Sequence, residues 1–327
     1  MTWRCARSTP TRSTTTTSPG NDRRADGPVR DRRRPGDRAG LPRRPGPARV
    51  RGIPPAGARQ GRDRLLRYYD GYLDIARRHE AGFIVETPTW RANPDWAGLL
   101  GYSPQRLDEL NRSAVDLAEQ VRAAARADGL TALVSGCVGP RGDGYDPGAV
   151  MTADEAQAYH AVQIATFAST SADQVTAITM TNTAEAIGVV RAATAAGVTP
   201  VVSFTVETDG RLPTGQPLHE AVAQTDAETG AAAGYFMVNC AHPGHFGAAF
   251  DHDGPWRERI GGLRANASKR SHAELDDATE LDEGDPGEFA AGHVALRGRM
   301  PAVSVLGGCC GTDARHVAAL CAAWEAN

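Results

Sequence analysis

Three cysteines in the second half of the chain have the residue type and the sequence context of a metal site. Cys309 and Cys310 are adjacent in VLGGCCGTDA, and Cys240 lies in VNCAHP. Each motif follows a short apolar run that predicts a strand. Neighbouring side chains of a regular strand point to opposite faces, so two adjacent thiols converge only where the strand is broken. Glycines on both sides of the pair supply that break, because glycine adopts backbone angles closed to other residues.

Such a group predicts a catalytic zinc centre. Three thiolates with an open fourth position are typical of a catalytic site, whereas four protein ligands close it. A zinc ion held by three thiolates is electron-rich and poorly suited to generating hydroxide, but it can bind an incoming thiol and present it as a nucleophile. The expected reaction is alkyl transfer to a thiol. On spacing alone, redox chemistry and plain packing stay open for Cys309 and Cys310, and His242 and His245 are further candidate ligands.

The elements that must position these residues alternate between short apolar strands and helices. At least six strand patterns occur between residues 82 and 308, with weaker evidence for another near RIGGLRANAS, and one helix opens with a capping box from Thr152 to Glu155. This alternation predicts an α/β fold with a parallel sheet, and the strand count favours a (β/α)8 barrel of the TIM type. No GxGxxG follows a strand and no GxxxxGK[ST] occurs, which disfavours a nucleotide site.

The C-terminal ends of the strands carry the chemistry in a barrel of this kind. The predicted strand ends are, in order, Glu86-Thr87-Pro88, Ser135-Gly136-Cys137, Thr179-Met180-Thr181, Thr205 to Glu207, Asn239-Cys240 and Gly307-Gly308-Cys309-Cys310. Cysteine is among the most buried residue types, so Cys137 and Cys321 are predicted to be core thiols.

Residues 1–61 are predicted to be a disordered Arg/Pro-rich segment ahead of a barrel at residues 62–327. The first 60 residues hold 15 of the 36 basic residues, 4 of the 39 acidic residues and nine prolines. With almost no Val, Ile, Leu, Met or Phe, they cannot bury enough apolar surface to offset their chain entropy. Prolines interrupt any continuous basic helix, which disfavours nucleic-acid binding. The composition is also that of GC-rich DNA read in a wrong frame or from a wrong start.

Composition places the chain among cytoplasmic proteins with free thiols. No apolar run reaches the roughly 18 residues of a membrane-spanning helix, and no signal-peptide core follows the start. Six cysteines in 327 residues do not make a disulfide scaffold. The expected partners are small molecules, with no membrane and no nucleic acid, and the oligomeric state stays open.

VNCAHP at 238–243 and GGCCGTDARHV at 307–317 resemble the paired signatures of the homocysteine S-methyltransferase family. The resemblance runs from about residue 62 to the end. Members of this family are zinc-dependent (β/α)8 barrels that move a methyl group onto the sulfur of homocysteine and form methionine. The resemblance therefore implies a methyltransferase of the EC 2.1.1 class, with Cys240, Cys309 and Cys310 as the Zn²⁺ ligands.

The resemblance also implies roles for residues around the metal. Asn239 would support the site, and Glu86 and Thr87 would lie near the amino-acid pocket as substrate-binding residues. Because the sequence shows no second large domain for folate or cobalamin, the expected methyl donor is a sulfonium or ammonium compound: S-methylmethionine, S-adenosylmethionine or betaine.

Two departures from the family pattern motivate an alternative function. The Asp-Gly-Gly-x-x-Glu element of the family's first strand does not occur before residue 62. The first strand is therefore predicted to be missing or replaced, which would leave two unpaired strand edges. The fourth strand often ends in Glu-Thr in this family, where this chain has Met180 and Thr181. The alternative is a catalytically impaired or inactive barrel that binds zinc or thiols.

Overall fold

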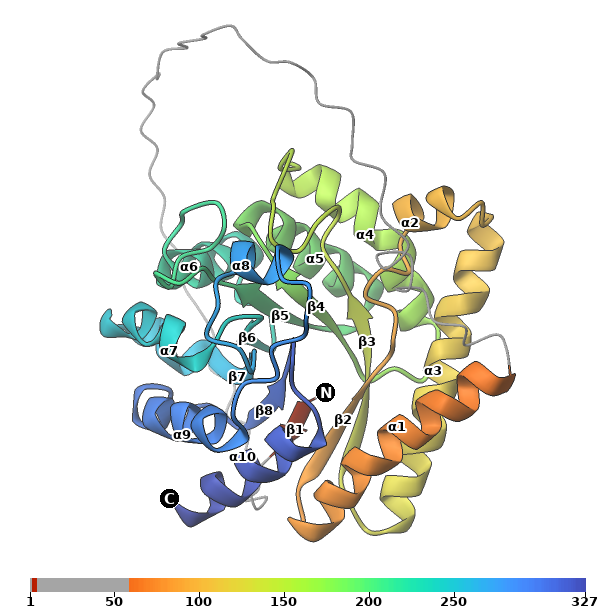
Figure 1. Cartoon of the computed structure of the whole chain (residues 1–327). Helices are drawn as coiled ribbons and strands as arrows, with labels where there is room; N and C mark the ends of the chain where they lie inside the picture. Colours follow the sequence, from red (N-terminus) through yellow and green to blue (C-terminus); the bar gives the residue numbers. More distant parts are fainter. Residues whose placement is uncertain (1, 5–58) are drawn as a thin grey trace, which may run out of the picture. The chain divides into compact units, whose positions relative to one another are not determined.

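The computed structural model describes residues 2–4 and 59–327 (Figure 1). Most of the predicted Arg/Pro-rich segment, residues 1 and 5–58, lies outside the described residues. Within the described residues, the strands close into a barrel in the order β1-β2-β3-β4-β5-β6-β7-β8. This confirms the predicted TIM-type barrel.

Seven of these strands form the parallel part of the barrel, each paired in parallel with the next. They are β2 (Gly82–Glu86), β3 (Ala132–Val138), β4 (Gln174–Met180), β5 (Thr199–Thr205), β6 (Tyr235–Asn239), β7 (Ile260–Ala265) and β8 (Val305–Gly308). The weakly predicted strand near RIGGLRANAS is β7. All of these strands end at the same rim, so their last residues and the loops that follow can build one site.

The first strand is replaced, as the sequence predicts, but by a segment from the extreme start of the chain. β1 (Thr2–Arg4) is three residues long and runs antiparallel to both of its neighbours. It pairs with Gly82–Ile84 of β2 and with Val305–Gly307 of β8. The two strand edges expected to be open are thus paired along most of β8 and along the first part of β2.

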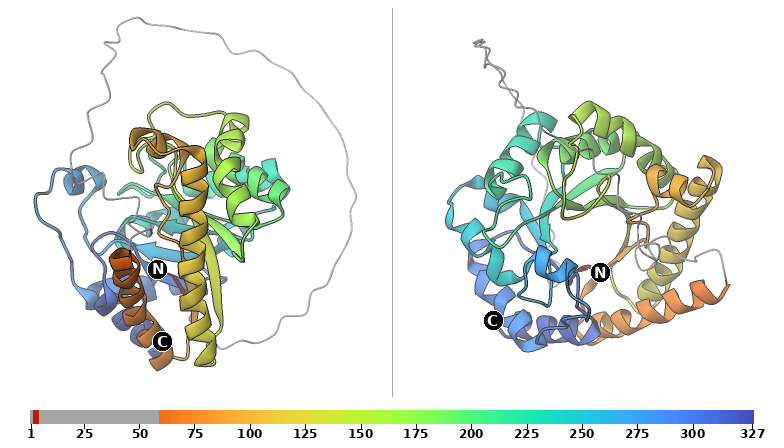
Figure 2. Two further views of the ribbon diagram at one scale, coloured as in Figure 1. Left: turned by 90° about the vertical axis from the view of Figure 1, so that its right-hand side faces the viewer. Right: turned by 45° about the horizontal axis from the view of Figure 1, so that its top comes forward.

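Helices surround the outside of the sheet (Figure 2). They are α1 (Arg59–Arg78), α2 (Pro94–Leu99), α3 (Pro104–Ala127), α4 (Ala153–Ala168), α5 (Thr183–Ala196), α6 (Leu218–Thr229), α7 (Pro243–Phe246), α8 (His272–Asp276), α9 (Pro286–Leu296) and α10 (Ala314–Ala326), with short 3-10 turns at Ala248–Asp251, Pro255–Arg259 and Arg297–Arg299. The capping box predicted at Thr152 and Glu155 is formed at the start of α4. Within the described part of the chain, no helix combines the length and the apolar character needed to cross a membrane.

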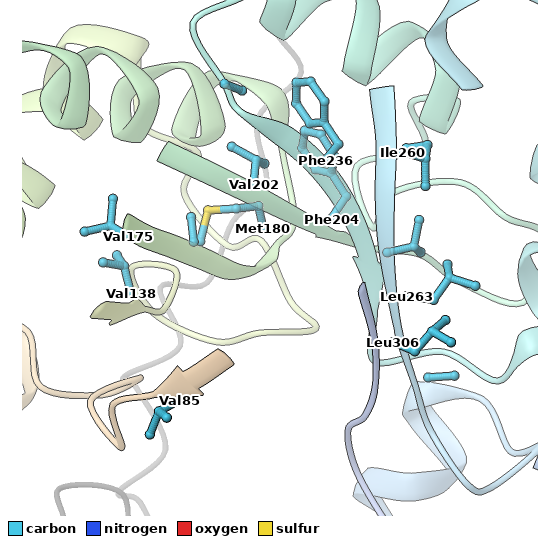
Figure 3. Packing of buried hydrophobic residues seen from close by; sticks show 14 of the residues in the cluster. Val85, Val138, Val175, Met180, Val202, Phe204, Phe236, Ile260, Leu263 and Leu306 are labelled. Carbon is cyan, nitrogen blue, oxygen red and sulfur yellow. The ribbon is translucent and has the colours of Figure 1, made fainter. Parts of the chain in front are cut away.

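The core has two layers because neighbouring residues of each strand face opposite sides of the sheet. The larger layer lies between strands and helices, and Figure 3 shows its strand residues, among them Val85, Phe204 and Leu306. A smaller cluster takes alternate positions of the same strands and contains Ile84, Val201, Met237 and Val305. The side chains of this smaller cluster lie before the strand ends, so the site begins where the apolar filling stops.

Candidate metal centre

The ends of β6 and β8 bring the three predicted cysteines together. Cys240 Sγ lies 2.8 Å from Cys309 Sγ and 3.6 Å from Cys310 Sγ. All three sulfur atoms lie within 4.8 Å of one another, and they are the group of metal-ligating side chains found among the described residues. Cys240 is buried, Cys309 is half-buried and Cys310 is exposed. The cluster therefore has one accessible side.

Unusual backbone conformations direct these thiols. Cys240 follows β6 directly and has a φ of +58°, which is uncommon for a residue other than glycine. Gly311 has a φ of +76° and turns the chain after the cysteine pair. At position 308 the close approach of another side chain requires glycine. A Cβ atom there would clash with the hydroxyl of Thr312. The glycine break is thus confirmed, and Cys240 adds a left-handed residue that the sequence pattern does not reveal.

Asn266, directly after β7, holds the two cysteine-bearing segments together. Its side-chain amide donates to the carbonyl of Cys240 (3.0 Å), and its side-chain oxygen accepts from the backbone N–H of Cys310 (3.0 Å). The backbone N–H of Cys309 donates to the carbonyl of Ala265. These bonds fix the main chain on both sides of the cluster, so the positions of the thiols depend on β7 as well as on β6 and β8.

Asn239 connects the cluster to β4. Its side-chain oxygen accepts from the backbone N–H of Thr179 (3.0 Å) and from the hydroxyl of Ser203 (2.5 Å), while its amide donates to the Thr179 hydroxyl (2.9 Å). Thr179 has a φ of +67° and lies at a register shift of β4. Two residues with left-handed backbone, Thr179 and Cys240, therefore lie against one buried asparagine, and such conformations persist only where surrounding contacts hold them.

Tyr145, in the loop between β3 and α4, contacts the cluster through its hydroxyl group. Its hydroxyl oxygen lies 3.3 Å from Cys310 Sγ and 3.6 Å from Cys240 Sγ. Burial raises the pKa of Tyr145, and the neighbouring thiols of Cys240 and Cys310 add to the rise, so the phenol keeps its proton. Its ring stacks on that of His272, the first residue of α8, with centroids 4.2 Å apart.

The sulfur atoms interact strongly with one another. Hydrogen bonds from the thiols of Cys240 and Cys310 hold the pKa of Cys309 well below its ordinary value, and the nearby Arg264 acts in the same direction. The pKa of Cys240 is raised in turn, because its thiol donates to Cys309 and is buried. The pKa of Cys310 is raised to about 12, because the hydrogen bond to Cys309 and the negative charge there outweigh the lowering effect of the hydrogen bond with Cys240, so the negative charge of the coupled set is held at Cys309. A divalent cation would neutralise that charge.

The donor set fits zinc. Zinc binds thiolate sulfur at about 2.3 Å, which puts the sulfurs around a tetrahedral ion roughly 3.8 Å apart. The three sulfur atoms lie within 4.8 Å of one another, so small adjustments suffice to place one ion among them. Thiolates are also the ligands that favour zinc over magnesium or calcium.

Comparison with known proteins decides the family. The family model of homocysteine S-methyltransferase matches residues 62–324. The chain belongs to the homocysteine S-methyltransferase family. It is therefore a methyltransferase by family, and the matched residues contain the whole thiol cluster. The comparison with curated protein sequences gives no match.

Solved structures of a bacterial homocysteine methyltransferase have the same fold. MmuM from Escherichia coli in its metallated form matches with a TM-score of 0.58 and 22% sequence identity, over 78% of this chain and 83% of that chain. The oxidised form of MmuM matches with a TM-score of 0.59 and 23% identity, over 80% of this chain and 87% of that chain. At these identities, the likeness supports the barrel architecture.

The two residues expected near the substrate of this family, Glu86 and Thr87, are buried and engaged within the barrel. The Glu86 carboxylate forms an ion pair with Arg264 of β7, and both side chains are almost fully enclosed. The Thr87 hydroxyl accepts from the backbone N–H of Cys137 (2.9 Å) and pairs with the hydroxyl of Thr89 (2.6 Å). Both residues lie at the strand-end rim, where Thr87 connects β2 to its neighbour β3 and Glu86 connects it across the barrel to β7.

A cavity of about 280 Å³ borders the exposed side of the cluster in this family member. Its walls come from α1, β7, β8, the following turn and α10, and its lining residues are Tyr68, Tyr72, Arg264, Gly308, Cys309, Cys310, Thr312 and Val317. The hydroxyl oxygens of Tyr68 and Tyr72 lie 3.4 Å apart. A small molecule in this cavity would contact the Cys309 and Cys310 end of the cluster.

Other candidate residues have structural partners. His242 caps α7 by accepting from the backbone N–H of Gly244 (3.1 Å), and His245 contacts the carbonyl of Lys269 (2.9 Å), so neither joins the thiols. The predicted core thiols Cys137 and Cys321 are both buried.

The C-terminal end of β4 carries Met180 and Thr181, where the family pattern often has Glu-Thr. Met180 is fully buried in the large core layer, and Thr181 is buried beside Asn182, whose amide donates to its hydroxyl. The register shift at Thr179 turns that residue, rather than Met180, toward Asn239.

Tyr145, Asn266 and His272 were not predicted from the sequence, whereas Thr179 lies at a predicted strand end. Asn266 directly follows a predicted strand, so the rule that strand ends carry the chemistry could have identified it. Tyr145 lies in a loop and His272 begins the short helix α8, and no motif or spacing in the sequence distinguishes either residue.

Proposed function

We propose that this chain transfers a methyl group to the thiol of homocysteine, giving methionine, with a zinc ion held by Cys240, Cys309 and Cys310. The observation that carries the proposal is the convergence of three thiols from two strand ends, with one exposed side that faces a cavity. When bound, zinc would stabilise the acceptor as its thiolate at neutral pH.

The chain's own residues would hold the reactants. The acceptor thiolate would attack the methyl carbon in line with the leaving atom of the donor, which departs as a neutral sulfide or amine. We propose a sulfonium or ammonium donor, such as S-methylmethionine, S-adenosylmethionine or betaine, because the cavity beside the cluster has the size of a small metabolite. Asn239 would hold Cys240 in place. Glu86 and Thr87 would shape the acceptor side of the rim, with Glu86 oriented by Arg264.

Zinc content and methyl transfer test the proposal. The purified chain is expected to contain about one zinc ion and to convert homocysteine to methionine with at least one of the three donors, measured by metal analysis and mass spectrometry. Cys310→Ala should lose both properties. Cys321→Ala, at a buried cysteine of α10 outside the cluster, serves as the control and should keep both. A zinc-free wild-type chain that is folded, or a fully active Cys310→Ala variant, would contradict the proposal.

A second candidate is a zinc- or thiol-binding barrel without catalysis. The antiparallel three-residue β1 favours it, because Thr2–Arg4 replaces the strand that carries a substrate element in the family. A version of the chain with a parallel first strand added separates the two candidates. If both versions fold, bind zinc and transfer no methyl group from any donor, the second candidate replaces the first.

A further inference from the structure

Arg264 contributes a positive charge to the wall of the cavity beside the thiol cluster. It belongs to β7, and its neighbours Leu263 and Ala265 pack in the large core layer between the strands and the helices. Since neighbouring residues of a strand face opposite sides of the sheet, the side chain of Arg264 points into the barrel. It therefore borders the same space as Cys309 and Cys310.

The protein uses only part of the hydrogen-bonding capacity of this guanidinium group. Its Nη1 donates to the Glu86 carboxylate, and the pair is almost fully enclosed. Its Nε is buried and has no hydrogen-bond partner within the described residues. A buried N–H group without a partner is costly, and a bound ligand is one way to satisfy it. Because a guanidinium group binds a carboxylate with two parallel hydrogen bonds, the Nε side of Arg264 suits a carboxylate.

The cavity wall offers no matching group for an ammonium ion. Within the described part of the chain, no aspartate and no glutamate lines the cavity. Burial and the hydrogen bond with Tyr68 raise the pKa of Tyr72, so this phenol is neutral. The Glu86 carboxylate is already paired with Arg264. Apart from the cluster, whose sulfur atoms would bind zinc, the charge at this cavity thus favours a carboxylate over an amine.

We propose that the acceptor is a mercaptocarboxylate held at two points, its sulfur at the thiol cluster and its carboxylate on Arg264, and that its amino group is not required. The inference rests on the proposed methyl transfer and names its acceptor class, of which homocysteine is one member. Arg264 lies opposite Gly307, two residues before Cys309, which corresponds to about 7 Å along the strand. Three carbons between a thiol and a carboxylate can span such a distance. Arg264 is thus a specificity-determining residue, and Glu86 positions it.

The test measures ligand binding to the zinc-loaded chain by isothermal titration calorimetry, with no methyl donor present. Three thiols separate the two groups: homocysteine, γ-mercaptobutyrate, which lacks the amino group, and γ-mercaptopropylamine, which lacks the carboxylate. Relative to homocysteine, γ-mercaptobutyrate should bind within about threefold and γ-mercaptopropylamine about 10- to 100-fold more weakly, the scale of losing hydrogen bonds to a charged group. Equal binding of homocysteine and the amine, or no binding of γ-mercaptobutyrate, would overturn the proposal.

Arg264→Lys keeps a positive charge beside Glu86 but removes the planar fork of the guanidinium group. It should weaken the binding of homocysteine and γ-mercaptobutyrate about tenfold and leave that of γ-mercaptopropylamine unchanged. A purely structural role would weaken all three ligands alike. Arg106→Lys, in an exposed pair with Glu109 on α3, is the matched control and should change none of them.

A double variant keeps the test decisive if lysine at position 264 disturbs the fold. Glu86→Gln combined with Arg264→Gln removes both charges of the enclosed pair together, so neither charge is left buried without its partner. The preference for the carboxylate ligand over the amine should disappear in this variant. A preference that persisted in the folded double variant would remove Arg264 from the proposal.

Betaine and S-methylmethionine also carry carboxylates, so each is titrated separately. If Arg264→Lys weakened the binding of these donors and not that of the two mercaptocarboxylates, the carboxylate on Arg264 would belong to the donor and the inference would be wrong. Methyl transfer is measured in a separate assay. Carboxylate-dependent binding without any methyl transfer would refute the proposed function alone, whereas equally efficient methylation of homocysteine and γ-mercaptopropylamine would refute the acceptor class alone.

Discussion

The two sides of the barrel rim are built on different principles. At the ends of β6, β7 and β8, main-chain and carboxamide hydrogen bonds converge on three cysteines whose sulfur atoms lie within 4.8 Å of one another. At the ends of β2 and β3, the polar side chains are engaged within the barrel: Glu86 reaches across to Arg264 of β7, and Thr87 bonds to the β3 main chain. One side is thus organised to leave its reactive atoms available, and the other to close the barrel.

This contrast shows that a residue at a strand end is available to a ligand only where other side chains do not already occupy its polar atoms. A polar residue at a strand end is a candidate by position, but its partners decide whether it can meet a ligand. Asn239, the last residue of β6, links the cysteine side to β4, because its side chain bonds to Thr179. Three substitutions test the contrast.

The largest effect is expected from removing a central sulfur. Cys309→Ala should weaken zinc binding by roughly a thousandfold or more, because each thiolate supplies a substantial share of the binding free energy of such a site. Methyl transfer should fall below detection. Zinc affinity is measured by competition with a chelator, and circular dichroism checks the fold. Retained tight zinc binding would mean that the three sulfurs do not act together.

Breaking the buried ion pair on the other side should reduce stability instead. Glu86→Ala leaves the enclosed Arg264 guanidinium without its carboxylate, which costs about 3–5 kcal/mol of unfolding free energy. Urea unfolding measures the loss. Glu109→Ala, which breaks an exposed pair with Arg106, is the control and should change stability by less than about 1 kcal/mol. If Glu86→Ala abolished zinc binding in a stable barrel, the division between the two sides would be wrong.

The smallest effect is expected at the link. Asn239→Ala removes the bonds that connect the residue before Cys240 to Thr179 and Ser203. Zinc affinity should fall by about 10- to 100-fold, the usual consequence of losing a residue that orients a ligand. Chelator competition measures it at a temperature where the variant remains folded. Unchanged affinity would show that the left-handed conformation of Cys240 does not need β4.

Much of the fold and the metal-binding side could be predicted because their signals are local. Alternating apolar runs and helices specified the parallel barrel, and the glycines around Cys309 and Cys310 marked the turn. The remainder depends on contacts between distant segments. β1 contains three residues near the start of a segment whose composition predicts disorder, so no pattern marks it as a strand. Its pairing with β2 and β8 exists because those strands offer unpaired edges.

The sequence by itself determined the barrel, the three thiols and the family to which they point, because residue type and spacing along the chain carry that information. Tertiary structure alone decided which other side chains reach the sulfurs. Tyr145 and Cys310 are 165 residues apart, yet the phenol oxygen lies 3.3 Å from the sulfur. Tertiary structure also decided that Glu86 pairs with Arg264, 178 residues away. Closure of the barrel creates both contacts, and periodicity along a strand or helix does not encode them.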